Sequence, residues 1–166
     1  MLAGMQLRYR YRIEPTERQQ QALAKAFGCA RVVYNDGLRL REDAYRQGLP
    51  FITDADLMRR VTTEAKKSPE RMWLTEVSAV VLQSSVIDLH RAYRNYFRAL
   101  AEFKAARARG EKAVLRVHRP KFKNKHHVQA VRFTANSRFR VLPNGRFFCG
   151  AGGREIPARC RGCGWA

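Results

Sequence analysis

A long amphipathic pattern between Ser78 and Arg107 constrains the fold of this chain more than any other feature. Apolar side chains recur there about every 3.6 residues over roughly eight turns, while cations occupy the opposite face. The apolar positions are Val81, Leu82, Ser85, Val86, Leu89, Ala92, Tyr93, Tyr96, Leu100 and Phe103. This pattern predicts the strongest helix in the chain.

Two further helical segments are predicted upstream. Thr16 followed by Gln19 has the spacing of a capping box, so a helix should open near residue 17. Its apolar stripe reaches residue 45 with candidate breaks at Gly28 and Gly37, which leaves one broken helix or a helix pair. Thr53, with an aspartate three residues on, predicts another helix that runs to about residue 67.

Extended segments flank this helical part. Residues 6–13 alternate strictly between apolar and cationic side chains, which is the period of a half-buried strand. Past residue 110 we expect short strands over 113–118, 128–134, 138–142 and 146–149. The Pro-Asn-Gly sequence at 143–145 is a hairpin turn signal between the last two.

These patterns predict an α+β fold. A small antiparallel β-barrel, built from residues 5–15 and 111–149, would be interrupted by an inserted helical lobe of three to four helices over residues 16–110. Residues 150–166 are expected to form an irregular tail, with a frameshift as one explanation of its unusual sequence.

Positive charge is concentrated in the last part of the chain. The 166 residues carry 33 Lys+Arg against 14 Asp+Glu, a formal net charge of +19. Residues 1–103 hold 17 of these cations and 12 of the acids, a net of +5, whereas residues 104–166 hold 16 and 2, a net of +14. Such a charge calls for a polyanionic partner, RNA or DNA. A ribosomal-type or merely soluble basic protein is the alternative that composition leaves open.

No stretch is apolar enough for a signal peptide or a membrane span, since blocks without a polar residue, such as residues 79–82, are far too short to cross a bilayer. We therefore expect a cytoplasmic protein without a membrane partner and with reduced cysteines. Cys160 and Cys163 have zinc-knuckle spacing, but a site would need two more ligands. The sequence therefore predicts no metal and no cofactor, with zinc as the weak alternative.

Residues 119–127 are the most concentrated candidate binding segment. Four cations surround one aromatic ring there, and they are Arg119, Lys121, Lys123 and Lys125. Cations of this kind bind phosphates, while Phe122 can anchor the segment in the barrel or stack on a base, and an isolated aromatic favours anchoring.

The acidic residues argue against catalysis. Hydrolysis by two metal ions needs carboxylates that converge on one place, whereas the acids here lie mostly on predicted helix surfaces or loops. No glycine-rich phosphate loop or nucleophile signature is present either. We therefore predict that the chain is not an enzyme.

Seven segments in order resemble the amino-terminal region of the TnpB proteins, also called OrfB, of bacterial insertion sequences. They are residues 9–16, 27–35, 73–77, 81–83, 92–97, 119–123 and 131–134. The resemblance implies a wedge-like barrel interrupted by a helical recognition lobe, often described as a transposase helix-turn-helix. It also implies that this region holds a guide RNA scaffold and grips the short DNA motif beside the target.

The resemblance completes the set of residues expected to bind nucleic acid. By position, Gln83, Thr134 and Asn136 match places where family members face the target-adjacent duplex, although capping or solvated roles fit them equally. The full set is Arg8, Arg10, Arg12, Gln83, Arg119, Lys121, Lys123, Lys125, Arg132, Thr134 and Asn136.

One departure from the family shapes the functional expectation. Family members continue into a RuvC-like nuclease with an acidic triad and a zinc ribbon, and the sequence here shows neither. We therefore expect a binding fragment without nuclease activity. The alternatives are a stand-alone DNA-binding repressor or decayed remnant of an insertion sequence, and a subunit completed by a separately encoded RuvC half.

Overall fold

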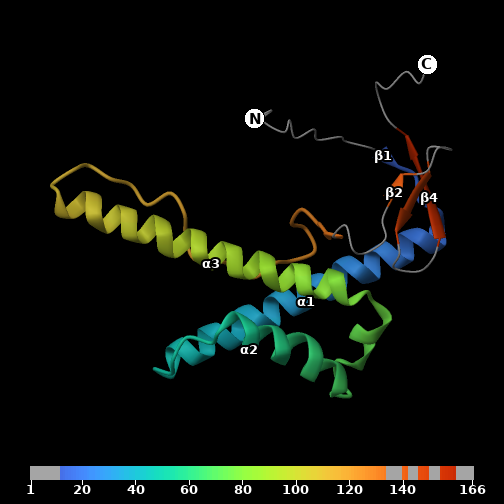
Figure 1. Ribbon diagram of the computed structural model, residues 1–166, viewed down its shortest axis with the longest axis horizontal. Coiled ribbons are helices and arrows are strands. Elements are labelled where there is room, and N and C mark those ends of the chain that lie inside the picture. The colour runs from blue at the N-terminus through green and yellow to red at the C-terminus, as the bar shows by residue number, and fades with distance from the viewer. Residues whose placement is uncertain (1–11, 134–139, 142–145, 150–153, 160–166) are drawn as a thin grey trace, which may run out of the picture. The chain divides into compact units, whose positions relative to one another are not determined.

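The computed structural model describes residues 12–133, 140–141, 146–149 and 154–159, and side chains from residue 14 to residue 133 (Figure 1). The chain divides into two compact units. One comprises Ala24–Phe133, and the other joins Met1–Leu23 to Thr134–Ala166. The first unit is helical and the strands belong to the second.

Helix α1 spans Glu17–Arg46 without interruption. At its start the backbone N–H of Thr16 donates to Oε1 of Gln19 at 2.9 Å, as the capping-box spacing predicts. The breaks considered at Gly28 and Gly37 do not occur. Gly37 instead lets neighbouring side chains pack close to the helix backbone. A Cβ there would lie 3.1 Å from Cδ2 of Leu89 and 3.5 Å from Cδ2 of Leu57, so the missing side chain lets these neighbours approach the helix closely.

The next helical stretch is continuous but changes its winding. Helix α2, Asp54–Met58, passes into the π-helical η1, Arg59–Glu64, and the 3₁₀-helical η2, Ala65–Lys67. Its predicted cap is confirmed, since the Thr53 side chain accepts from the backbone N–H of Asp56 at 3.1 Å. A second 3₁₀ segment, η3, Met72–Glu76, leads into the longest apolar pattern.

Helix α3 spans Ala79–Ala108, within one residue of the predicted bounds. Its apolar face and that of α1 enclose the core together with α2, η1 and η3 (Figure 1). The largest fully buried side chains are Leu38, Leu57, Leu74, Leu82, Leu89, Val33, Val81 and Val86. A buried hydrogen bond joins α3 to α1, from Oγ of Ser85 to the carbonyl of Ala30 at 2.5 Å.

The described strands form one antiparallel sheet in the order β1-β4-β3-β2. Their bounds are Arg12–Ile13 for β1, Arg140–Val141 for β2, Arg146–Cys149 for β3 and Arg154–Arg159 for β4. As predicted, β2 pairs with β3, and β1 joins the strands from the end of the chain. Part of the tail expected to be irregular is also a strand, β4.

The predicted β-barrel is nevertheless wrong, and the described part of the molecule is mainly helical. The outer strands β1 and β2 each pair with one neighbour only, so the described sheet is open. Residues 113–118 and the described part of 128–134 form no strands either. They belong to the helical unit, where the backbone of Lys123 is satisfied by the Asn35 side chain rather than by a neighbouring strand.

Candidate nucleic-acid interface

The chain after α3 contains a basic segment, residues 119–133, and hydrogen bonds to its backbone hold it against α1. The side chain of Asn35 donates from Nδ2 to the carbonyl of Lys123 at 2.9 Å and accepts from the Lys123 N–H at Oδ1, also at 2.9 Å. Both hydrogen-bonding groups of that peptide position are thereby satisfied. Asn35 thus holds the centre of the segment in one register against the helix.

Lys123 itself is a contact residue of this segment. Its Nζ lies 4.0 Å from the centroid of the Tyr34 ring, a cation–π geometry. Burial lowers the pKa of the Lys123 ammonium, and the charge of Asp88 acts in the opposite direction. A half-buried ammonium over a buried ring favours a role in docking the segment onto α1.

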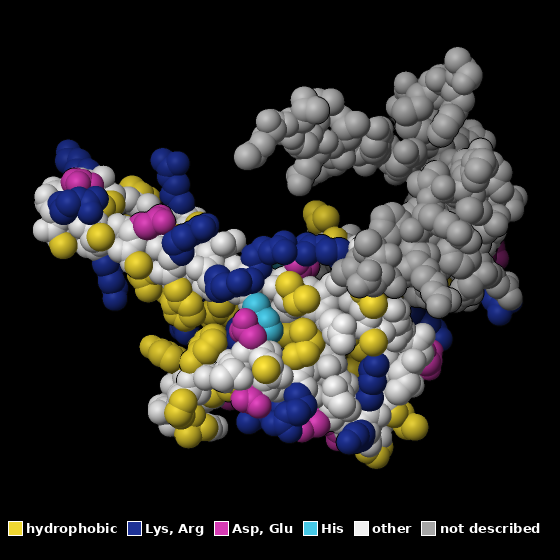
Figure 2. Space-filling model, viewed as in Figure 1, with side chains coloured by type: hydrophobic (Ala, Val, Ile, Leu, Met, Phe, Trp, Pro, Cys, Tyr) yellow, Lys and Arg dark blue, Asp and Glu magenta, His cyan; other side chains and the backbone are white. Residues whose placement is uncertain are grey.

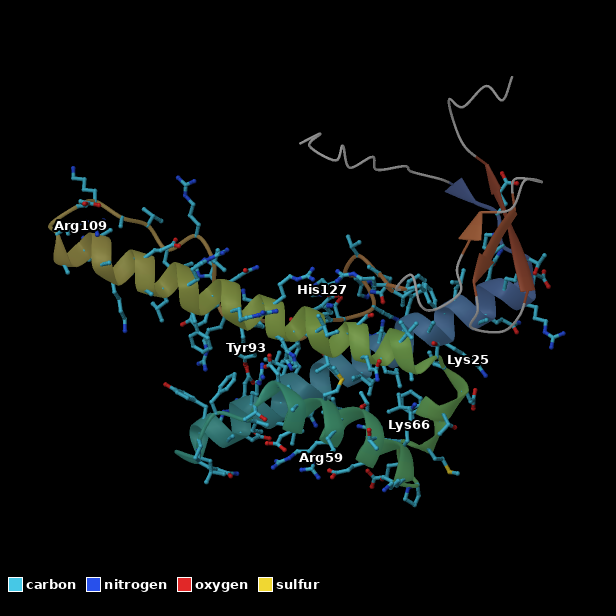
Figure 3. All side chains as sticks on the ribbon, in the orientation of Figure 1. Lys25, Arg59, Lys66, Tyr93, Arg109 and His127 are labelled. Carbon is cyan, nitrogen blue, oxygen red and sulfur yellow. The ribbon has the colours of Figure 1, made fainter. Side chains whose placement is uncertain are left out.

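Gln129 and Asn124 tie the segment to itself and to α1. Nη1 of Arg31 donates to Oε1 of Gln129 at 3.1 Å, and Nε2 of Gln129 donates to the carbonyls of Asn124 at 3.1 Å and His127 at 2.6 Å. Oδ1 of Asn124 accepts from the N–H groups of the next turn, including that of His127 at 3.1 Å. The turn that contains His127, labelled in Figure 3, is therefore held by side chains.

Arg132 fastens the end of the segment to α3. Its Nη2 lies 3.0 Å from Oδ1 of Asp88, and both side chains are partly exposed. A small recess lies between the two helices and the segment, lined among others by Arg31, Ser84, Asp88 and Lys123. An ion pair at its rim neutralises one of the cations that the sequence assigned to nucleic-acid binding.

The remaining cations of the segment point to solvent. Lys121 and Lys125 are exposed, and Phe122 between them is 43% exposed, so the expected anchoring of this ring in a barrel is wrong. Arg119 is exposed as well, with its guanidinium carbon 4.7 Å from the centroid of the Tyr45 ring. The backbone of the segment is thus held firmly while its outer cations are free to meet phosphates.

Helix α3 adds further cations beside the segment. Arg94, Arg98, Lys104 and Arg107 are exposed, and within the described residues none of them has an acidic partner. Figure 2 shows Lys and Arg side chains gathered along α3 and the chain that follows it. We call these four residues, together with Arg119, Lys121 and Lys125, the basic surface.

Other residues predicted to bind nucleic acid fall outside this surface or outside the described residues. Gln83 is exposed on the first third of α3. Arg12 lies in β1, and no side-chain position is described for it. The positions outside the described residues are Arg8, Arg10, Thr134, Asn136, Cys160 and Cys163.

Sequence reasoning did not identify the residues that hold the segment in place. Asn35, Arg31 and Asp88 lie 88, 98 and 44 positions from their respective partners, as their residue numbers show, and no local pattern connects residues so far apart. The dipeptide Tyr34-Asn35 lies in residues 27–35, one of the segments that resemble the TnpB family. That resemblance was the one sequence feature that pointed to these two residues. The structure shows that both members contact Lys123.

Several acidic side chains in the helical unit form ion pairs with nearby cations. Asp36 faces Arg71 at 3.0 Å and Glu76 faces Lys25 at 2.7 Å. Over the part of the chain that the structure describes, no three His, Cys, Asp or Glu side chains gather in a way that could hold a metal ion. No helix among those residues is long and apolar enough to cross a membrane.

Known proteins resemble this chain over as much as two thirds of its length. The family described as a helix-turn-helix domain matches residues 1–49. A Streptomyces pristinaespiralis protein named as a candidate RNA-guided DNA endonuclease is 30% identical over 112 residues, 66% of this chain and 27% of that protein. The Escherichia coli K12 protein InsQ, which bears the same description, is 29% identical over 108 residues, 65% of this chain and 27% of its own length.

A third relative matches this chain over most of the relative's own length. The virulence protein VsdF of Salmonella dublin is 31% identical over 91 residues, which is 51% of this chain and 76% of that protein. By contrast, the match spans only about a quarter of the two longer relatives. The matched helix-turn-helix domain and the likeness to these endonuclease-named proteins show that the chain belongs to the TnpB/OrfB family of insertion-sequence proteins.

Proposed function

We propose that this chain is a nucleic-acid-binding part of a TnpB-type transposon protein, and that it holds a guide RNA scaffold and contacts the DNA beside the target through the basic surface. The observation that carries the proposal is the pair of hydrogen bonds between the Asn35 side chain and the backbone of Lys123. A peptide segment held by an amide on both of its backbone groups keeps its outer lysines at fixed positions. Lysines on a backbone that is already ordered neutralise phosphates with less loss of backbone conformational entropy than those of a free tail would.

The names of the two long relatives support the choice of partners. Both are described as RNA-guided DNA endonucleases, so RNA and DNA are the polyanions that this cationic surface is proposed to meet. The charge agrees, because the stretch with a net of +14, residues 104–166, includes the segment that lies along α1 and α3. Phosphate contacts of this kind fix position and orientation rather than sequence.

We further propose that this chain binds without cleaving and without a cofactor. Cleavage is assigned to a RuvC-type segment that works with it, encoded together with it or separately. The carboxylates described here support this division of labour, since Asp36, Glu76 and Asp88 each face a cation. A carboxylate that holds a catalytic metal has to leave such a pair.

The first test measures binding and its dependence on salt. The purified 166-residue chain is titrated against labelled structured RNA and duplex DNA at several salt concentrations, with a chelator present. We expect tight binding at low salt that weakens steeply as salt rises, because bound counterions are released on association. Equal binding by a chain without positive charge on the basic surface would contradict the proposal.

Matched variants locate the interface. Lys121→Ala with Lys125→Ala removes two exposed cations of the basic surface, and we expect the slope of log affinity against log salt to fall by about two. Lys66→Ala with Lys67→Ala is the control, since these lysines belong to η2 and Figure 3 places Lys66 on the other side of the helical unit from His127. Equal losses in both pairs would show that only total charge matters.

A further inference from the structure

A cluster of aromatic rings lies where the turn before α2 meets α3. The Phe51 ring contacts Tyr93 and Phe97 edge to face, with centroids 6.0 and 6.1 Å apart. Tyr93 and Phe97 stack at 5.9 Å, and Tyr96 lies 5.3 Å from Phe97. Each ring therefore has its orientation fixed by at least one other ring.

Arg41 supports this cluster from the protein interior. Its side chain is 2% exposed, and its guanidinium carbon lies 4.2 Å from the Phe51 centroid and 5.1 Å from that of Tyr93. Nη2 donates to Asp54 Oδ1 at 2.7 Å and to the carbonyl of Ile52 at 3.2 Å. Nε and Nη1 have no hydrogen-bond partner, so the ring faces are what this buried cation otherwise contacts.

Although the rings are fixed, much of their surface is open to solvent. Phe51 is 55% exposed and Phe97 47% exposed. The guanidinium of Arg41 lies over the Phe51 ring, and more than half of the Phe51 surface is still exposed. Leu49 and Tyr45 are also exposed, and Figure 2 shows hydrophobic side chains gathered along α3. A cluster of exposed, immobilised rings differs from the scattered apolar residues of an ordinary surface.

Unpaired cations surround these rings. Arg94 and Arg98 occupy the same stretch of α3 as Phe97 and are exposed without an acidic partner in the described chain. Arg119 lies over the Tyr45 ring. Burial raises the pKa of the Tyr93 hydroxyl, and the charge of Arg119 opposes that rise. The rings are therefore bordered by three members of the basic surface.

We propose that Phe51 and Phe97 form a stacking platform for unpaired bases of a single-stranded nucleic acid, whose phosphates are neutralised by Arg94, Arg98 and Arg119. The inference rests on the proposed nucleic-acid-binding function and adds the class of ligand at this site. Exposed aromatic faces beside a cationic track are the combination that binds single strands. Bases of a duplex are already stacked on one another and cannot cover an aromatic side chain.

The surrounding charge favours this occupant over a protein. A polynucleotide supplies a planar base and a phosphate together at each residue, and both kinds of partner group are present here. A protein segment would satisfy the rings but would need its own acids to meet Arg94, Arg98 and Arg119. The experiment below separates the two.

The test compares oligonucleotides of equal charge with and without bases. The full chain is titrated with a single-stranded oligonucleotide and with its abasic counterpart. The variants are Phe51→Leu and Phe97→Leu, with Phe51→Tyr as the variant that keeps a ring and Met72→Leu as a control at an exposed apolar residue in η3. Thermal unfolding verifies that each variant is folded.

Stacking predicts a specific pattern of affinities. The unmodified chain should prefer the base-containing strand about tenfold, Phe51→Leu and Phe97→Leu should lose most of that preference, and Phe51→Tyr and Met72→Leu should retain it. Duplex binding should change little in all variants. Equal affinity of the unmodified chain for the two strands would overturn the platform while leaving phosphate binding intact, and would assign the rings to a protein partner. Failure to bind any polynucleotide at low salt would overturn the proposed function as well.

Discussion

Asn35 on α1 pairs with the backbone of Lys123 in the same way that one strand pairs with another, through one donated and one accepted hydrogen bond of 2.9 Å each. The two residues are 88 positions apart. This relationship joins the basic segment to the helical core. The segment's backbone is satisfied by a side chain instead of a sheet.

Asn35→Ala should release the segment. Both hydrogen bonds are lost and two half-buried backbone groups of Lys123 are left to water, so we expect the free energy of unfolding to fall by about 1–3 kcal/mol. Amide hydrogen exchange should accelerate at Lys123 and its neighbours while the core of α3 stays protected. Asn95→Ala, at an exposed residue of α3, is the control. Unchanged exchange at Lys123 would show that Tyr34 and Gln129 hold the segment without Asn35.

Asp88→Asn should strengthen nucleic-acid binding. The substitution frees Arg132 from an ion pair of 3.0 Å and Arg91 from a longer one of 4.0 Å, and it adds one unit of positive charge at the basic segment. Stability should change by less than about 1 kcal/mol, because the pair is partly exposed.

Titration with duplex DNA at two salt concentrations measures the effect of Asp88→Asn, and the gain should be larger at low salt. Glu64→Gln is the control, since it removes a pair with Arg59 in η1 and makes the same change in net charge. An equal gain in both variants would mean that the arginines released from Asp88 make no local contribution.

Replacing two glycines of α1 by larger residues should change the free energy of unfolding in opposite directions. At Gly28 nothing lies within 4 Å of an added Cβ, so Gly28→Ala should raise the free energy of unfolding by about 0.5–1 kcal/mol through helix propensity. Gly37→Val should lower it by about 1–3 kcal/mol, because its branches meet Leu89 and Leu57. Chemical denaturation measures both variants. A stabilising Gly37→Val would contradict the close approach of α3 to α1.

His90 should make the stability of the protein depend on pH. Burial lowers the pKa of its imidazole, the charge of Asp54 opposes this, and Arg41 and Arg94 add to it. In the unfolded chain the pKa returns to about 6.5, so the unfolded state binds more protons once the pH falls below that value. Stability is therefore complete above about pH 6.5 and is lost as the pH decreases toward the folded pKa.

Denaturant titrations at about pH 7.5 and about pH 5.5, both chosen around the ordinary imidazole pKa, test this dependence. His90→Gln should lose less stability between the two conditions than the unmodified chain does. His118→Gln is the control, because this histidine is exposed after α3. If all three proteins lose the same amount, other groups cause the pH dependence.

Local order in this chain follows directly from its sequence. The apolar period over 78–107 produces α3, the Thr16 and Thr53 spacings mark two helix starts, and the turn signal at 143–145 separates two strands that pair. Each of these features depends on residues close together in the chain, where spacing alone decides which groups can meet. The concentration of charge after residue 104 is likewise a property of the sequence alone.

The tertiary structure decided where the basic segment lies and which of its cations remain available. The extended texture after residue 110 predicted strands of a barrel over 113–118 and 128–134, yet a local sequence pattern does not determine what satisfies the backbone. The Asn35 side chain does so at Lys123, and Asp88 pairs with Arg132, whereas Lys121 and Lys125 face solvent. Contacts between residues so far apart depend on how the helices pack, and no period in the sequence encodes that packing.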